Sequence, residues 1–174
     1  LTVRFPSPLA SAVDRLVYLG YAVPPLAFAL SMVFFALRAA PFLYQTLALL
    51  IFAYAMTFLA LAMGPMRSRL LQIGPRLEEV SRSLGCGPWQ AFMRTTFPLL
   101  RRPMLAAGLL VFISVVKELP ITFLLAPTGH TTLSMAVFSR TSEGMMAEAA
   151  PYALMIVIFS SLFVGLILRH EGRR

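Results

Sequence analysis

The amino-acid sequence predicts an all-α, polytopic membrane protein, and three observations support this fold class. Of the 174 residues, 59% are hydrophobic and 13% are charged, and the mean hydropathy is +0.80. A soluble domain of this size needs a more polar surface to cover its core. Several uncharged stretches are long enough to cross a bilayer, and basic residues gather between them. Since we find no internal repeat and no soluble domain, residues 1–174 are predicted to form one transmembrane domain.

Three uncharged stretches predict transmembrane helices directly. Residues 16–37 lie between Arg15 and Arg38, residues 41–63 form the second stretch, and residues 149–168 precede the basic end of the chain. Each stretch reaches the roughly 20 residues that a helix needs to cross the hydrocarbon core. These three spans are the simplest part of the predicted topology.

A fourth span is predicted over residues 99–118, although its uncharged part is short. Residues 103–116 make 14 residues, about 21 Å of helix, and the hydrocarbon core is roughly 30 Å thick. A full span must therefore continue past Lys117 and Glu118, which would lie in the outer part of the membrane or at its far edge. The next stretch, 119–139, is broken by two prolines and a glycine, which predicts a short re-entrant or interfacial segment.

The distribution of basic residues predicts the orientation of these helices. If the loop 67–102 is cytoplasmic, twelve of the 15 basic residues lie on that side and three, Arg38, Lys117 and Arg140, lie on the other. The twelve are Arg4, Arg15, Arg67, Arg69, Arg76, Arg82, Arg94, Arg101, Arg102, Arg169, Arg173 and Arg174. Cytoplasmic loops of membrane proteins are rich in Lys and Arg. The chain is therefore predicted to be a multi-pass protein of the cell membrane, with both of its ends in the cytoplasm.

Composition argues against several other classes of protein. The net charge of +8 suits residues that flank membrane spans, so we expect the lipid bilayer and not nucleic acid as a partner. The single cysteine, Cys86, cannot form an intramolecular disulfide. His130 lacks carboxylate or thiolate neighbours at metal-ligand spacing, and His170 in the basic tail is expected to face solvent or lipid headgroups, so we predict no metal site and no cofactor. The first residue is Leu1 and not Met, which suggests the C-terminal portion of a longer chain.

A polar segment, 75–87, interrupts the apolar sequence inside the loop 67–98. Glu78 and Glu79 suit the first turn of a short helix, and Gly85 suits its end. One face of this helix carries three apolar side chains, Leu77, Val80 and Leu84. So short a helix is not stable alone in water, so it packs either on the membrane helices or on a partner protein.

The spacing of residues in this loop carries a likeness to a known family. Glu79-Val80-Ser81 is followed by three residues, Gly85, nine residues and Thr95-Thr96-Phe97-Pro98. This spacing resembles the cytoplasmic signature of ABC importer permeases, which is Glu-Ala-Ala, three residues, Gly, nine residues and Ile-x-Leu-Pro. Both alanines, the Ile and the Leu are replaced here, so the likeness rests on Glu79, Gly85 and Pro98.

Two further stretches extend the resemblance over nearly the whole chain. "YAVPPLAFAL" (21–30) is similar to the Pro-Gly helix of these permeases, with Pro25 where glycine is usual. "KELPITFLLAPTGHTTL" (117–133) resembles the Lys-Glu-Leu-Pro segment of permeases in the ferric iron and thiamine importer group. The resemblance therefore points to ferric iron as the first choice of substrate, with thiamine, phosphonates and other small solutes still open.

The resemblance implies a type I ABC importer transmembrane domain, with 75–87 as the coupling helix that docks on separate cytoplasmic ABC ATPase subunits. A periplasmic or extracellular substrate-binding protein and a second permease half, in the same chain or a homodimer, are the other implied partners. The residues predicted to take part in coupling to the ATPase are Glu79, Ser81, Arg82, Gly85 and Pro98. Arg82 pairs either with acids of the ATPase or with Glu78 one turn earlier.

The chain itself is not expected to be an enzyme. No phosphate-binding loop surrounds the only lysine, Lys117, and no catalytic residues are predicted, so ATP hydrolysis is expected on a partner. Lys117, Glu118 and Pro120 are instead predicted to line the translocation pathway, because ionisable residues at membrane depth are costly and usually functional. A pair that snorkels at the outer interface is the alternative. A different class also remains open, an ATP-independent secondary transporter that uses broken helices with Lys117 and Glu118.

Overall fold

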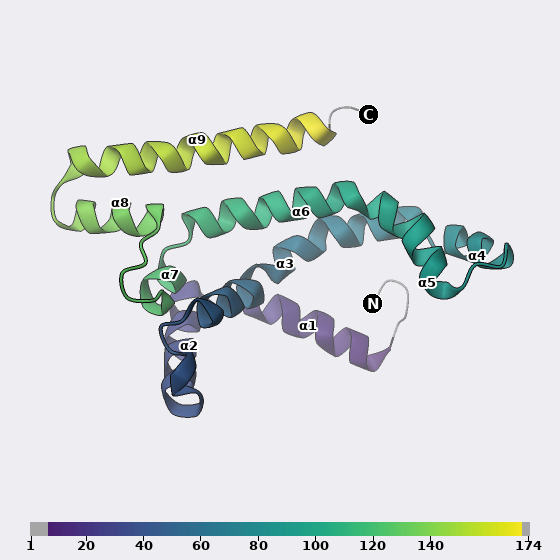
Figure 1. Cartoon of the computed structure of the whole chain (residues 1–174), viewed down its shortest axis with the longest axis horizontal. Coiled ribbons are helices and arrows are strands. Elements are labelled where there is room, and N and C mark those ends of the chain that lie inside the picture. Colours follow the sequence, from purple (N-terminus) through teal and green to yellow (C-terminus); the bar gives the residue numbers. More distant parts are fainter. Residues whose placement is uncertain (1–6, 172–174) are drawn as a thin grey trace.

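The computed structural model of the chain describes residues 7–171, and every regular element in that range is helical. Three long helices run along the long axis of the molecule (Figure 1): α3 (Leu47–Ile73), α6 (Phe97–Lys117) and α9 (Met146–Glu171). Each belongs to a helical segment that is long and apolar enough to cross a membrane. The predicted all-α architecture with membrane spans is confirmed.

The first predicted span is a bent pair of helices. The chain bends by 108° between α1 (Pro8–Ala22) and α2 (Pro25–Ala39). The ring of Pro24 disfavours helical backbone at Val23, which is extended (φ −77°, ψ 134°), and Pro25 starts the second helix where no N–H is needed. The expectation of one continuous helix over 16–37 is therefore wrong, and the two helices together have the length and composition of one broken span.

The fourth predicted span is longer at its N-terminal end, whereas the sequence predicted an extension at its C-terminal end. α6 ends at Lys117 and does not continue past Glu118. Its N-terminal side joins the π-helical turn η2 (Phe92–Thr96) and α5 (Pro88–Ala91), so that 88–117 is a helical segment of 30 residues. The expectation that this helix extends beyond the Lys117–Glu118 pair is corrected accordingly.

The remaining predicted boundaries differ from the observed helices by a few residues. Ahead of α3, the 3-10 turn η1 (Pro41–Leu43) occupies the first part of the predicted span 41–63, and α3 itself continues through Pro65 to Ile73. After α6 come two short helices, α7 (Pro120–Leu125) and α8 (Leu133–Ser142), joined by an irregular segment. Residues 119–139 are thus broken, as their prolines indicate.

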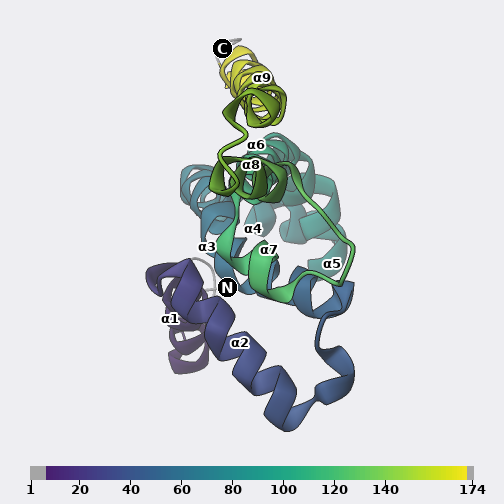
Figure 2. The ribbon, with the colours of Figure 1, turned by 90° about the vertical axis from the view of Figure 1, so that its left-hand side faces the viewer.

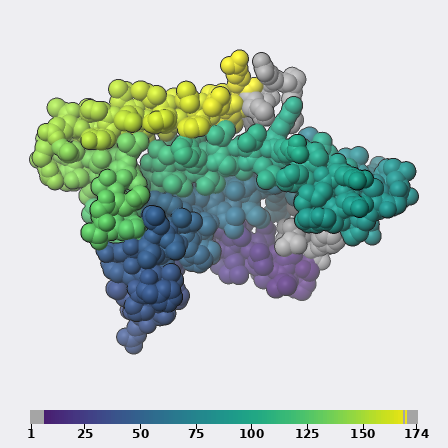
Figure 3. Space-filling view, in the orientation of Figure 1, coloured from purple at the N-terminus to yellow at the C-terminus, as the bar shows by residue number. Residues whose placement is uncertain are grey.

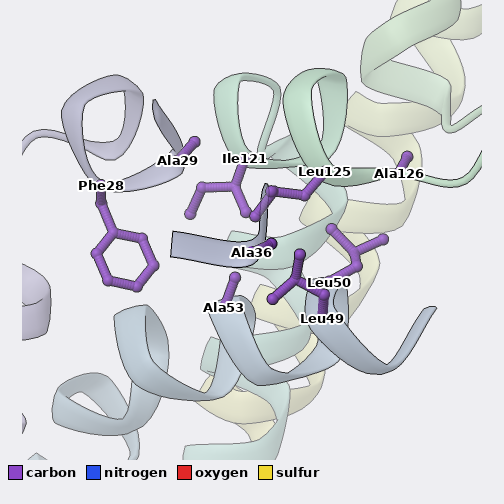
Figure 4. Close-up of a cluster of buried hydrophobic side chains, with 9 residues drawn as sticks. All are labelled: Phe28, Ala29, Ala36, Leu49, Leu50, Ala53, Ile121, Leu125 and Ala126. Atoms are coloured by element: carbon purple, nitrogen blue, oxygen red, sulfur yellow. The ribbon is translucent and has the colours of Figure 1, made fainter. Parts of the chain in front are cut away.

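The main hydrophobic core lies where α7 meets α2 and α3 (Figure 4). It contains Phe28, Ala29 and Ala36 of α2, Leu49, Leu50 and Ala53 of α3, and Ile121, Leu125 and Ala126 at α7. The small alanine side chains allow the helix backbones to approach closely, as in other membrane helix packings. By contrast, α9 lies at the outer edge of the molecule (Figure 2), and none of its apolar window is buried.

A glycine allows α1 to pack directly against α3. A Cβ placed on Gly20 would lie 2.4 Å from the Met56 carbonyl oxygen. We expect Gly20→Ala to force the two helices apart and to lower the free energy of unfolding by about 1–3 kcal/mol. Thermal unfolding of the purified protein in detergent measures this loss. Gly108→Ala in α6 is the matched control, because a Cβ there meets nothing within 4 Å; equal melting temperatures for the two variants would contradict the close approach.

Candidate functional site

The predicted coupling region projects at one end of the molecule, here called the α4 end. α4 (Arg76–Ser83) and α5 lie together there, and the teal surface in Figure 3 shows them beyond the long helices. The start of α1 and the end of α9 lie toward the same end, whereas α7 and the α8–α9 connection lie at the opposite one (Figure 1). Of the basic residues assigned to this side, Arg4, Arg173 and Arg174 lie outside the described residues.

Local sequence explains why α4 is short. Pro75 precedes the helix, and Glu78 and Glu79 occupy its first turn, where acidic side chains favour the helix dipole. Gly85 has φ +87°, in the left-handed region that favours glycine, and its N–H donates to the Arg82 carbonyl oxygen at 3.0 Å. The predicted helix at 75–87 is thus observed over Arg76–Ser83, with the glycine directly after its C-cap.

The inner side of α4 is attached to the start of the α6 segment. Thr96 of η2 is fully buried, and its hydroxyl donates to the Glu78 carboxylate. The π-helical turn is closed by the Phe97 N–H, which donates to the Phe92 carbonyl five residues earlier, and Pro98 follows directly. A contact between α4 and the α6 segment therefore exists that sequence analysis did not identify.

The outer side of α4 is left uncovered. No residue of α4 is buried, and the three apolar side chains that share a face are exposed: Leu77 is 44% exposed, Val80 58% and Leu84 80%. Glu79 and Arg82 are also exposed, and Ser81 is half-buried. The sequence left open whether this face packs on the membrane helices or on a partner protein. In the described part of the chain, it does not pack on the membrane helices.

The predicted pathway residues lie at the opposite end, where α6 stops. Lys117 is exposed, whereas Glu118 is only 7% exposed. The Glu118 carboxylate accepts hydrogen bonds from the backbone N–H of Ile121, at 3.0 and 3.2 Å, and of Thr122, at 3.2 Å. It thereby caps the first turn of α7, which Pro120 begins without needing a donor.

Side chains from other helices join this cap. We call Tyr54, Glu118, Thr122 and Ser134 the Glu118 cluster. The Tyr54 hydroxyl of α3 bonds to the Thr122 hydroxyl, and the Ser134 hydroxyl of α8 donates to the Glu118 backbone carbonyl at 2.7 Å. The cluster thus links α3, α7 and α8 to the end of α6. In the sequence, an acid just before a proline-initiated helix was the available signal for the cap.

An ion pair joins α8 to α9, and the described residues contain no metal cluster. Arg140 of α8 pairs with Glu148 of α9. Among the side chains that the structure describes, no group of three or more His, Cys, Asp or Glu is placed to hold a metal ion. The loop residue His130 is exposed, and the side chain of His170 lies outside the description.

Comparison with known proteins then decides the identity of the chain. Residues 1–170 match the family model described as binding-protein-dependent transport system inner membrane component. The chain belongs to this family. Members are permeases with the type I ABC importer transmembrane domain, so the predicted family and fold class are both confirmed, and the chain is a multi-pass membrane protein.

Several curated permeases of this family are similar to the chain. The Fe(3+)-transport system permease protein FbpB 2 of Haemophilus influenzae is 42% identical over 168 residues, which cover 97% of this chain and 33% of the relative. The putative 2-aminoethylphosphonate transport system permease protein PhnV of Salmonella typhimurium is 29% identical, over 84% of this chain and 56% of the relative. The molybdenum transport system permease protein ModB of Azotobacter vinelandii is 27% identical, over 81% and 62%. The chain therefore spans between a third and two thirds of these relatives.

Proposed function

We propose that the chain is a membrane-spanning permease subunit of an ABC importer, with α4 as the helix that receives motion from a separate ATPase. The observation that carries this proposal is the exposed apolar face of α4, formed by Leu77, Val80 and Leu84. An isolated helix of eight residues is unstable in water, and an uncovered apolar face on it suits a protein partner. Family membership supports the ABC importer over an ion-driven secondary carrier.

The contacts of α4 suggest how its motion would reach the membrane. The Thr96–Glu78 hydrogen bond attaches α4 to η2, and η2 continues directly into α6. A displacement of α4 by the ATPase would therefore act on α6 and the helices packed against it. Glu79 and Gly85, exposed on α4 and just after its end, are proposed to contact the ATPase, together with Ser81, Arg82 and Pro98. Arg82 is exposed but lies on the same side of α4 as Glu78, where both line a hollow beside α5 and η2.

The proposed orientation places the α4 end in the cytoplasm and the Glu118 cluster toward the outer face. The basic loop 67–102 supports this direction, since positive loops remain on the cytoplasmic side. A substrate-binding protein would then approach the outer segment 119–148, and a second permease half would cover apolar helix faces that remain exposed, such as that of α9. Lys117, Glu118 and Pro120 stay proposed pathway residues at that outer end.

Ferric iron is the proposed cargo, because the relative with 42% identity is named an Fe(3+)-transport permease. Relatives named for 2-aminoethylphosphonate and molybdenum transport share the same family at lower identity. In an importer of this kind the binding protein supplies much of the specificity, so the cargo is best tested on the complete system. Uptake of radiolabelled iron, competed separately by each of the other solutes, distinguishes these cargoes.

Crosslinking from the native cysteine tests the docking of α4. Cys86 is the only cysteine, is half-buried, and follows Gly85 directly. We expect it to form a disulfide with single cysteines placed along the groove of the partner ATPase, because docking would bring this end of α4 within a few ångströms of the groove. Ser139→Cys in a Cys86→Ser background is the matched control, since Ser139 is exposed on α8 at the opposite end. No crosslink from Cys86 at any groove position would contradict the docking.

A further inference from the structure

A cavity of about 700 Å³ lies between α3, α6 and α9, apart from both the exposed face of α4 and the Glu118 cluster. Its walls come from the last turns of α3, the first half of α6 and the last turns of α9, so it opens near the α4 end. A volume of this size matches ordinary small-ligand sites in proteins.

One end of the cavity is polar and positively charged. Arg69 and Gln72 of α3 and Arg102 of α6 line it, and the Arg69 guanidinium donates to the Gln72 amide oxygen at 3.0 Å. This bond uses one of five N–H donors of Arg69, so further donors remain for a ligand. Among the described residues that line the cavity there is no carboxylate. The rim therefore favours an anion.

The cavity becomes apolar with distance from this rim. Leu105 and Leu109 follow Arg102 by one and two turns of α6, about 5 and 10 Å further along the helix, and Leu166 faces them from α9. α3 runs antiparallel to α6 (Figure 1) and ends toward the α4 end, so Pro65 precedes Arg69 by about one turn of α3 and lies further from that end. Polarity thus changes along the direction in which the helices cross the membrane.

We propose that this cavity binds an anionic phospholipid of the cytoplasmic leaflet. Its phosphate would lie between Arg69 and Arg102, and an acyl chain would follow Leu105, Leu109 and Leu166 inward. A soluble anion would leave the apolar wall uncovered, and an apolar helix would leave two arginines without counter-charge. Basic pockets between transmembrane helices on the cytoplasmic side suit such headgroups. This proposal rests on the proposed orientation, in which the α4 end lies in the cytoplasm. It does not depend on the docking of α4 on an ATPase.

Lipid titration of the intact, delipidated importer in mild detergent tests the proposal. Native mass spectrometry measures the apparent affinity for phosphatidylglycerol in the wild type and in an Arg69→Gln/Arg102→Gln double variant. Each arginine near an anionic lipid contributes about a fivefold factor, so the loss of both is expected to lower the affinity about twenty-fivefold. The control is Arg76→Gln/Arg94→Gln, which removes the same charge from exposed positions outside the cavity and is expected to keep the affinity.

Three further comparisons accompany this titration. Phosphatidylcholine is expected to bind weakly and equally to all forms, and glycerol phosphate is expected not to displace phosphatidylglycerol, because it lacks the acyl chain. Arg102→Lys, which keeps the charge, is expected to bind phosphatidylglycerol more tightly than Arg102→Gln. This comparison tests the charge at one position, without the double substitution. Equal affinities of the double variant and its control overturn the proposal. Absence of phosphatidylglycerol from the wild type also overturns it and indicates that another part of the importer covers the cavity.

Discussion

Glu118→Ala is expected to destabilise the protein by about 3 kcal/mol or more, the larger of the two stability changes predicted here. The Glu118 carboxylate accepts from two backbone N–H groups of α7, and the Thr122 hydroxyl lies 3.3 Å from it. Alanine would leave these buried donors without an acceptor in a region that is closed to solvent. Thermal unfolding in detergent, followed by light scattering or fluorescence, measures the effect.

Two variants control this experiment. Glu118→Gln keeps one oxygen acceptor of similar shape, so its loss of stability is expected to be less than half as large. Glu143→Ala removes an exposed acid at the end of α8, where a change within about 0.5 kcal/mol is expected. If Glu118→Ala is as stable as Glu143→Ala, the cap is not important to stability. Normal stability but lost uptake in Glu118→Gln would support the proposed pathway role of Glu118.

Glu79→Lys is expected to reduce ATP-dependent uptake by about tenfold or more, while the amount of inserted protein stays normal. Glu79 is exposed on α4 and its side chain is not part of the Thr96–Glu78 contact, so the charge reversal should leave the fold intact. At a docked surface, reversing one charge of a close pair commonly costs about 2–5 kcal/mol. Uptake by proteoliposomes that contain the complete importer, normalised to permease content, measures the loss.

Glu143→Lys is the matched control for this second experiment. It makes the same charge reversal at an exposed acid, but at the end of the molecule opposite to α4. Because Glu143 belongs to segment 119–148, which is proposed to face the substrate-binding protein, the readout for this control is the basal ATPase rate without that protein. We expect Glu143→Lys to leave this basal rate unchanged. If Glu79→Lys and the wild type take up substrate equally, Glu79 is not a coupling residue. This result would not bear on lipid binding in the cavity, which the lipid titration measures separately.

Several features of the fold were predictable because they depend on neighbouring residues. The long uncharged stretches predicted α3 and α9, and the glutamates and Gly85 predicted the short helix α4. The same local reasoning did not identify the bend between α1 and α2, although Pro24-Pro25 was visible. Hydropathy averages over a window, so it reports apolar length and not whether the backbone is continuous.

The sequence by itself determined the class of protein: a polytopic membrane protein with a basic loop and a short helix, whose spacing resembles the signature of ABC importer permeases. These properties are carried by composition and by intervals along the chain. Only the tertiary structure decided what each polar group contacts. Tyr54 and Thr122 are 68 positions apart, and Glu78 and Thr96 are 18 apart. Their contacts depend on how α3, α4, α6 and α7 pack, and helix packing depends on side-chain shape at many positions at once.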